Sequence, residues 1–253
     1  MIAAGAALFL LAGCGRGARS GIRDRGAGAS AEAASGQATP TAESGARYAL
    51  TPGPDTQSVV FLGTSLTAGL GLDPAQSYPA LIQRKLDSLR LPWRAVNAGV
   101  SGETSAGALR RLDWVLGSRP AVLVVETGAN DGLRGMDLDS TRANIEAIVR
   151  RAREAMPGIR IVLAGMAVPT NLGARYEAEF RRIFTEVAAR ERVALIPFLL
   201  QGVGGVDSLN QADGIHPTAA GQRIVAGNVW RVLGPMLKAG TGAQGPAGTG
   251  GSR

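Results

Sequence analysis

The stretch Ser58-Val59-Val60-Phe61-Leu62-Gly63-Thr64-Ser65-Leu66-Thr67-Ala68-Gly69 decides the fold, because an apolar run leads there directly into small and polar residues. A short run of this kind, ended by a glycine, is typical of a strand that is buried on both faces of a parallel sheet. Similar runs follow along the chain, at residues 94–97, 121–125, 159–164 and 193–196. Residues 58–62 therefore predict the first of about five parallel strands.

Amphipathic stretches lie between these runs and after the last of them, over about 74–90, 105–117, 139–156, 175–191 and 217–238. Their apolar residues suit helices that pack one face against a sheet. The alternation of strands and helices predicts an α/β fold, a three-layer α/β/α doubly wound sheet with right-handed crossovers. In such sheets, ligands bind beyond the carboxyl ends of the strands.

The length of 253 residues is enough for one sizeable domain. Many of its 36 glycines gather toward the two ends, where residues 15–54 and 239–253 consist largely of small and polar residues without an apolar period. Such segments bury too little apolar surface to offset their conformational entropy. The sequence therefore predicts a folded domain over residues 55–238, a disordered tether over 14–54 and a disordered tail over 239–253.

The formal net charge of +7 does not by itself indicate a nucleic-acid partner. The basic residues are spread along the chain, and aromatic residues are not interleaved with them as a stacking surface would require. We therefore expect no nucleic-acid binding.

Residues 2–12 form an apolar run that is too short to span a bilayer as a helix and has the length of a signal-peptide core. The run ends in Leu11-Ala12-Gly13-Cys14, which resembles the lipobox of bacterial lipoproteins, where cleavage precedes a cysteine that then carries a lipid. The resemblance implies a signal peptide over residues 1–13, lipidation of Cys14 and an extracytoplasmic protein anchored to a membrane. The alternative is a buried apolar helix in which Cys14 is a small hydrophobic residue.

The chain has a single histidine, in the segment Asp213-Gly214-Ile215-His216-Pro217. Imidazole is the usual proton carrier in hydrolytic catalysis, because its unperturbed pKa lies near neutrality. A carboxylate three residues before His216 can reach Nδ1–H within one local turn, which leaves Nε2 free as a base. A lone histidine is nevertheless more often a surface or core residue, so its role depends on the other groups that face it.

Three further segments follow predicted strands. Ser65 stands on a turn after the first strand, where it is either a nucleophile or an ordinary helix cap. The segment 97–104 contains two glycines, which allow a tight turn and leave backbone N–H groups free to face a ligand. Asn130, after the third strand, can present its amide as a hydrogen-bond donor or serve as a turn residue.

Taken together, these four segments resemble the SGNH hydrolase (GDSL-type esterase and lipase) family, whose members carry Ser, Gly, Asn and His in four blocks. The resemblance covers residues 57–237, and the order and spacing are similar to those of the thioesterase I, lysophospholipase L1 and arylesterase branch. The fold that it implies is the flavodoxin-like SGNH hydrolase fold. One position differs, because the family usually has Asp where this chain has Thr64.

The resemblance implies that Ser65 is the nucleophile, His216 the base and Asp213 the orienting acid. It also implies an oxyanion hole formed by the backbone N–H of Ser65, the N–H of Gly102 and the side-chain amide of Asn130. No metal or organic cofactor is implied.

The expected activity is hydrolysis of carboxylic esters or thioesters through an acyl-enzyme. Lysophospholipids or short- to medium-chain acyl and aryl esters are the expected substrates, and O-acetylated glycans are the alternative. A non-catalytic lipoprotein that binds a lipid or a glycan is a third possibility. Neither the physiological substrate nor the oligomeric state follows from the sequence.

Overall fold

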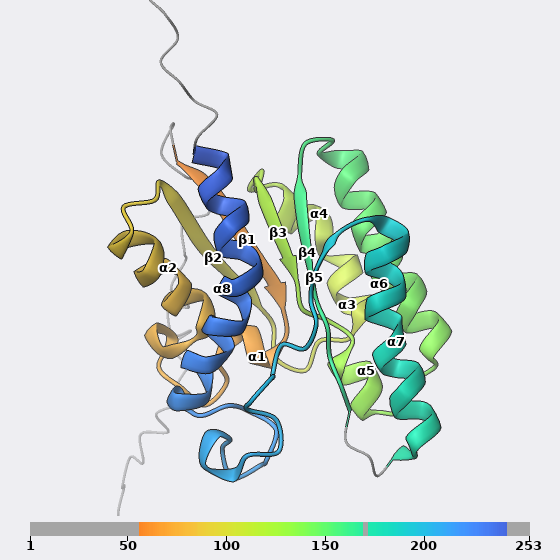
Figure 1. The fold of residues 1–253 in the computed structure, drawn as a ribbon. Helices are drawn as coiled ribbons and strands as arrows, with labels where there is room; N and C mark the ends of the chain where they lie inside the picture. Colours follow the sequence, from red (N-terminus) through yellow and green to blue (C-terminus); the bar gives the residue numbers. More distant parts are fainter. Residues whose placement is uncertain (1–55, 169–171, 242–253) are drawn as a thin grey trace, which may run out of the picture. The chain divides into compact units, whose positions relative to one another are not determined.

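The computed structural model describes residues 56–168 and 172–241, all of which lie in the unit Ala46–Arg253. Its centre is a sheet of five strands in the order β2-β1-β3-β4-β5, and every neighbouring pair is parallel (Figure 1). The strands are β1 (Gln57–Gly63), β2 (Trp93–Gly99), β3 (Val122–Val125), β4 (Arg160–Ala164) and β5 (Ala194–Ile196). The predicted parallel α/β sheet is thus confirmed, and each predicted strand lies within two residues of its observed bounds.

Helices cover both faces of this sheet. On one face α2 packs against α8, and on the other α6 packs against α3 and α7 (Figure 1). The α-helices are α1 (Ser65–Ala68), α2 (Tyr78–Ser88), α3 (Ser105–Arg110), α4 (Leu112–Leu116), α5 (Ala129–Leu133), α6 (Leu138–Ala155), α7 (Ala174–Glu191) and α8 (Ala219–Thr241). Short 3-10 helices occupy Pro74–Gln76 and Asp207–Leu209.

Two of the predicted helices are divided in the structure. The stretch 74–90 becomes a 3-10 turn and α2, because Ser77 between them adopts an extended conformation. The stretch 105–117 becomes α3 and α4, and the backbone of Arg111 leaves the helical conformation between them (φ −96°, ψ 5°). The side chain of Arg111 turns inward toward the ends of β1 and β2.

The core lies where the two central strands meet the helices. Val59 to Leu62 in β1 and Val122 to Val125 in β3 are at most 1% exposed, as expected of strands that are covered on both faces. The outer strands β2 and β5 contain partly exposed residues. The continuous apolar runs of the sequence therefore mark the centre of the sheet.

The strand order reverses direction between β1 and β3, and ligand sites of doubly wound sheets lie at such a position, beyond the carboxyl ends of the strands. Figure 1 shows α1, which follows β1, at the same lower edge of the sheet as the long segment between β5 and α8. The site residues predicted from the sequence lie on the segments that leave this edge.

Several predictions concern residues that the structure does not describe. The signal peptide over 1–13, lipidated Cys14, the tether over 14–54 and most of the tail over 239–253 lie outside the described residues, so they stay predictions. Within the described residues, α8 continues to Thr241, three residues beyond the predicted end of the domain. No helix in the described part of the chain is long and apolar enough to cross a bilayer.

Candidate active site

Ser65, His216 and Asp213 form one continuous chain of hydrogen bonds. Nε2 of His216 lies 2.8 Å from Oγ of Ser65, and Nδ1 of His216 lies 2.6 Å from Oδ2 of Asp213. The Ser65 residue is 8% exposed, while the Asp213 side chain is 45% exposed. Ser65 and His216 are 151 residues apart in the sequence, so the fold rather than local structure brings them together.

The carboxylate of Asp213 is held by its own turn. Its Oδ1 accepts hydrogen bonds from the backbone N–H groups of Ile215 (2.9 Å) and His216 (3.0 Å), while Oδ2 faces the imidazole. These bonds, chiefly the one from the His216 backbone, lower the pKa of Asp213 to about 2, because they favour the ionised form. The local turn expected from the sequence is therefore present, and it presents an ionised carboxylate to Nδ1.

This low pKa predicts the form of the pH profile for any reaction in which His216 acts as a base. Asp213 stays ionised as the pH falls through the range in which imidazoles titrate, because its pKa is depressed to about 2. Asp213 should therefore contribute no protonation step to the loss of activity on mild acidification. We expect the acid limb of log(kcat/KM) against pH to have a slope of about one. A slope of about two in initial-rate measurements would contradict this assignment.

The segment 207–218 is also attached to the turn that follows α1. Nε2 of Gln211 donates to the carbonyl oxygens of Leu70 (2.8 Å) and Pro217 (3.1 Å), and the Gln211 N–H donates to the carbonyl of His216 (2.7 Å). Gln211 thus connects the histidine segment to the part of the chain that carries Ser65. Sequence reasoning missed this residue, because an isolated glutamine in a loop carries no recognisable signal.

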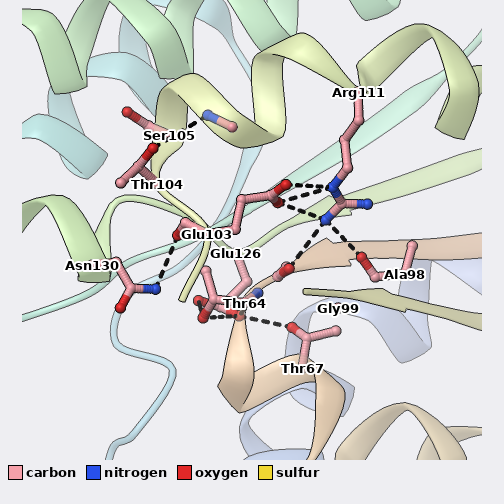
Figure 2. Close-up of polar contacts among 12 residues, drawn as sticks. Thr64, Thr67, Ala98, Gly99, Glu103, Thr104, Ser105, Arg111, Glu126 and Asn130 are labelled. Carbon is pink, nitrogen blue, oxygen red and sulfur yellow. Dashed lines mark hydrogen bonds and ion pairs between the residues drawn. The ribbon is translucent and has the colours of Figure 1, made fainter. Parts of the chain in front are cut away.

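Ser65 begins α1 immediately beyond β1, and the buried carboxylate of Glu126 lies beside this turn (Figure 2). Glu126 accepts hydrogen bonds from the backbone N–H of Thr64 (2.7 Å), from Oγ1 of Thr64 (2.9 Å) and from Oγ1 of Thr67 (2.8 Å). A Cβ at Gly63 would overlap Oγ1 of Thr67 and stand 2.8 Å from Oε2 of Glu126, so only glycine leaves room for these two side chains. Glu126 therefore fixes the residue that precedes Ser65.

Burial raises the pKa of the Glu126 carboxyl, and the hydrogen bonds from Thr64 and Thr67 oppose the rise. This environment gives a physical reason why the chain has Thr64 where the family usually has aspartate. An aspartate at position 64 would place a second carboxylate against Glu126, whereas the threonine hydroxyl donates a hydrogen bond to it. Threonine thus supports the turn without adding a buried charge.

The two other expected donors lie in the turn after β2 and at the start of α5. Gly63 and Gly99 pair in register at the ends of β1 and β2, and the Val100 N–H donates to the Gly63 carbonyl at 2.8 Å. Gly102 lies in the turn that follows, with φ of +76°, a conformation that favours glycine. Nδ2 of Asn130, in α5, donates to the carbonyl of Glu103 at 2.9 Å (Figure 2), so the start of α5 is joined to the loop after β2.

Each of these donors keeps one hydrogen available. Within the described residues, neither the backbone N–H of Ser65 nor that of Gly102 has an acceptor, and only one hydrogen of the Asn130 amide is used. Each of the three groups therefore has an N–H that is free to donate to a ligand. No group of three or more His, Cys, Asp or Glu side chains that could hold a metal ion occurs in the part of the chain that the structure describes.

Sequence reasoning also missed three charged residues of this region: Glu103, Arg111 and Glu126. Glu126 has a weak sequence signal, because a carboxylate directly after a fully buried strand needs partners. Glu103 and Arg111 give no such signal, since their pairing depends on how the helix ends at Arg111.

Comparison with known proteins gives consistent results. The model of the GDSL-like lipase/acylhydrolase family matches residues 61–224. The chain is 44% identical over 182 residues to the esterase TesA of Pseudomonas aeruginosa, which covers 72% of this chain and 90% of that protein. It is 33% identical over 183 residues to the thioesterase 1/protease 1/lysophospholipase L1 of Escherichia coli K12, and the match covers 71% of this chain and 85% of that protein. The solved structure of the psychrotrophic esterase EstA from Pseudoalteromonas sp., inhibited by monoethylphosphonate, has a TM-score of 0.68 at 32% identity and covers 72% of this chain and 99% of that one.

Proposed function

The chain belongs to the GDSL-like lipase/acylhydrolase family and is a hydrolase of ester bonds, and from this we propose that Ser65 is its nucleophile, His216 its general base and Asp213 the orienting carboxylate. The observation that carries the proposal is the continuous hydrogen-bonded chain from Asp213 through His216 to Ser65. Asp213 accepts from Nδ1 and leaves Nε2 to accept the proton of the serine hydroxyl.

In the first step, Oγ of Ser65 attacks the ester carbonyl while its proton passes to Nε2 of His216. The carbonyl oxygen becomes negatively charged and accepts hydrogen bonds from the backbone N–H groups of Ser65 and Gly102 and from the amide of Asn130. A preorganised donor of this kind contributes about 3 kcal/mol to the stability of the transition state. The tetrahedral intermediate then collapses, the imidazolium protonates the leaving alcohol or thiol, and Ser65 carries the acyl group.

In the second step, water attacks the acyl-enzyme. The water oxygen bonds to the acyl carbon while His216 takes a proton from the water. The three N–H donors of the first step again stabilise the oxyanion. The carbon–oxygen bond to Ser65 then breaks, and the imidazolium returns the proton to Oγ. The products are a carboxylic acid and the free enzyme, so every proton that leaves a group is returned without a cofactor.

The proposed substrates are lysophospholipids or other short- to medium-chain acyl or aryl esters. Most of the exposed large apolar side chains of the described residues lie on segments that follow the carboxyl ends of strands. They are Leu70, Val100, Leu133, Met136, Leu172, Val206 and Ile215. Exposed apolar side chains on the segments that carry the site favour an acyl chain over an acetyl group on a polar sugar, because each buried methylene contributes about 0.8 kcal/mol.

A series of p-nitrophenyl esters tests this preference. We expect the protein to hydrolyse the acetate, butyrate and decanoate esters, with kcat/KM for a longer ester exceeding that for the acetate by about tenfold or more. Leu70→Ser should reduce this preference, and Leu89→Ser is the matched control. The two leucines are 45% and 44% exposed, but Leu89 follows α2 at the opposite edge of the sheet.

The outcomes of this assay separate the candidate functions. A preference for the acetate would favour the glycan O-acetylesterase and overturn the acyl-chain proposal. The absence of hydrolysis for every ester would overturn the catalytic roles assigned to Ser65 and His216.

A further inference from the structure

We propose that Arg111 and Glu103 are positioning residues of the oxyanion hole, an inference that rests on the function proposed above. Nε of Arg111 donates to both carboxylate oxygens of Glu103 (2.7 and 2.9 Å), and Nη2 donates to Oε2 (2.7 Å). The side chains are 18% and 10% exposed, so the pair is largely shielded from solvent. Such a forked, charge-assisted contact restrains both partners in direction as well as in distance.

The same guanidinium is bonded to the ends of two strands (Figure 2). Nη2 of Arg111 also donates to the carbonyl oxygens of Ala98, in β2 (2.8 Å), and of Gly63, at the end of β1 (3.2 Å). Gly63 lies two residues before Ser65. Arg111 therefore connects the loop that contains Glu103 to the strand that leads to the proposed nucleophile.

Glu103 extends this connection to the two other proposed donors. It directly follows Gly102, and its N–H closes the turn by donating to the carbonyl of Val100 at 3.3 Å. Its carbonyl accepts the amide of Asn130 at 2.9 Å, which directs the side chain of Asn130 toward this loop. Ser65 and Gly102 thus stand within two residues of a group that the Arg111–Glu103 pair holds, and Asn130 donates to the carbonyl of Glu103.

The loop after β2 needs a restraint of this kind, because it contains Gly102. Gly102 is exposed and lies at positive φ, where glycine has wide conformational freedom. An N–H group stabilises an oxyanion only if its direction is fixed before the charge develops. In the described part of the chain, one side chain bonds directly to the backbone of Gly102: Nη2 of Arg134 donates to its carbonyl at 3.0 Å. The Arg111–Glu103 pair restrains the residue that directly follows Gly102, and Arg134 restrains the carbonyl of Gly102 itself.

The test compares Arg111→Lys, which keeps the charge and loses the fork, with Arg110→Met as the matched control. Arg110 is the preceding, exposed residue at the end of α3, and no ion pair joins it to another described residue. For p-nitrophenyl butyrate we expect Arg111→Lys to lower kcat by about 10²-fold with KM changed by less than about threefold. Glu103→Gln should have a similar effect, and the double variant should be no worse than the worse single variant.

Inhibitor binding separates positioning from a general loss of structure. An alkyl boronic acid forms a tetrahedral adduct with the serine and places an oxygen in the oxyanion hole, whereas the product butyrate imitates the ground state. We expect the affinity for the boronic acid to fall in proportion to kcat/KM across the variants, and the affinity for butyrate to stay constant. The melting temperature is measured in parallel, and Glu103→Gln serves as the second variant should Arg111→Lys fail to fold.

Three results would overturn the inference. The first is full activity in both Arg111→Lys and Glu103→Gln, and the second is an equal loss of affinity for the boronic acid and for butyrate. The third is a loss of kcat that disappears at temperatures well below melting. If the unaltered protein hydrolyses no ester, the proposed function fails first and this inference fails with it. An active parent with fully active variants overturns this inference alone.

Discussion

Ser65→Ala is expected to lower kcat by about 10⁶-fold while leaving the protein folded, because no other group can supply the attacking oxygen. The Ser65 side chain donates its hydrogen bond to His216, and its loss removes no contact within the apolar core. The residual rate should exceed that in water, since the three N–H donors and the substrate-binding surface remain. Initial rates with a p-nitrophenyl ester and a circular-dichroism melt measure the two quantities.

Covalent labelling gives a second readout for the same change. A fluorophosphonate probe reacts with an activated serine, so it should label the unaltered protein once and Ser65→Ala not at all. Ser88→Ala is the matched control, because Ser88 is exposed on α2 and, among the described residues, its hydroxyl bonds only to the carbonyl of Lys85. Labelling that persists in Ser65→Ala would show that another residue is the nucleophile.

His216→Ala is expected to have an effect of similar size, about 10⁶-fold in kcat, because the chain contains no second imidazole. Removing both Ser65 and His216 should cost little more than removing either, since the two act as one unit. The cavity left at position 216 opens toward solvent, as the side chain is 17% exposed. Added imidazole should therefore restore part of the activity of His216→Ala and none of the activity of Ser65→Ala. Equal rescue of both variants, or retained activity in His216→Ala, would contradict the role of the base.

The sheet could be predicted well because its information is local. The runs at 58–62 and 121–125 are apolar throughout, and the structure buries both at the centre of the sheet. The division of 105–117 at Arg111 could not be predicted in the same way. Helical periodicity continues across the break. The hydrogen bonds that hold Arg111 there go to carbonyl groups of β1 and β2, which are distant in sequence.

The candidate site shows the same distinction. The bond between Asp213 and His216 spans three residues, so the sequence could predict it from a local turn. The meeting of Ser65 with His216 spans 151 residues, and it could be expected only through the resemblance to a family. Glu126 escaped prediction for a further reason. Its partners Thr64 and Thr67 are 62 and 59 residues away, and short polar side chains near a helix start are usually explained as caps.

The connection made by Gln211 has a consequence for how the protein loses activity. Asp213 and His216 belong to one self-contained turn, whereas Ser65 is built into the sheet through β1. Besides the bond between His216 and Ser65, the bond from Gln211 to Leu70 crosses between these two modules. The turn could undock as a rigid piece with the three hydrogen bonds of Asp213 intact, while every strand and helix stayed in place. Inactivation on heating is then expected to precede unfolding, at a temperature set by these two contacts.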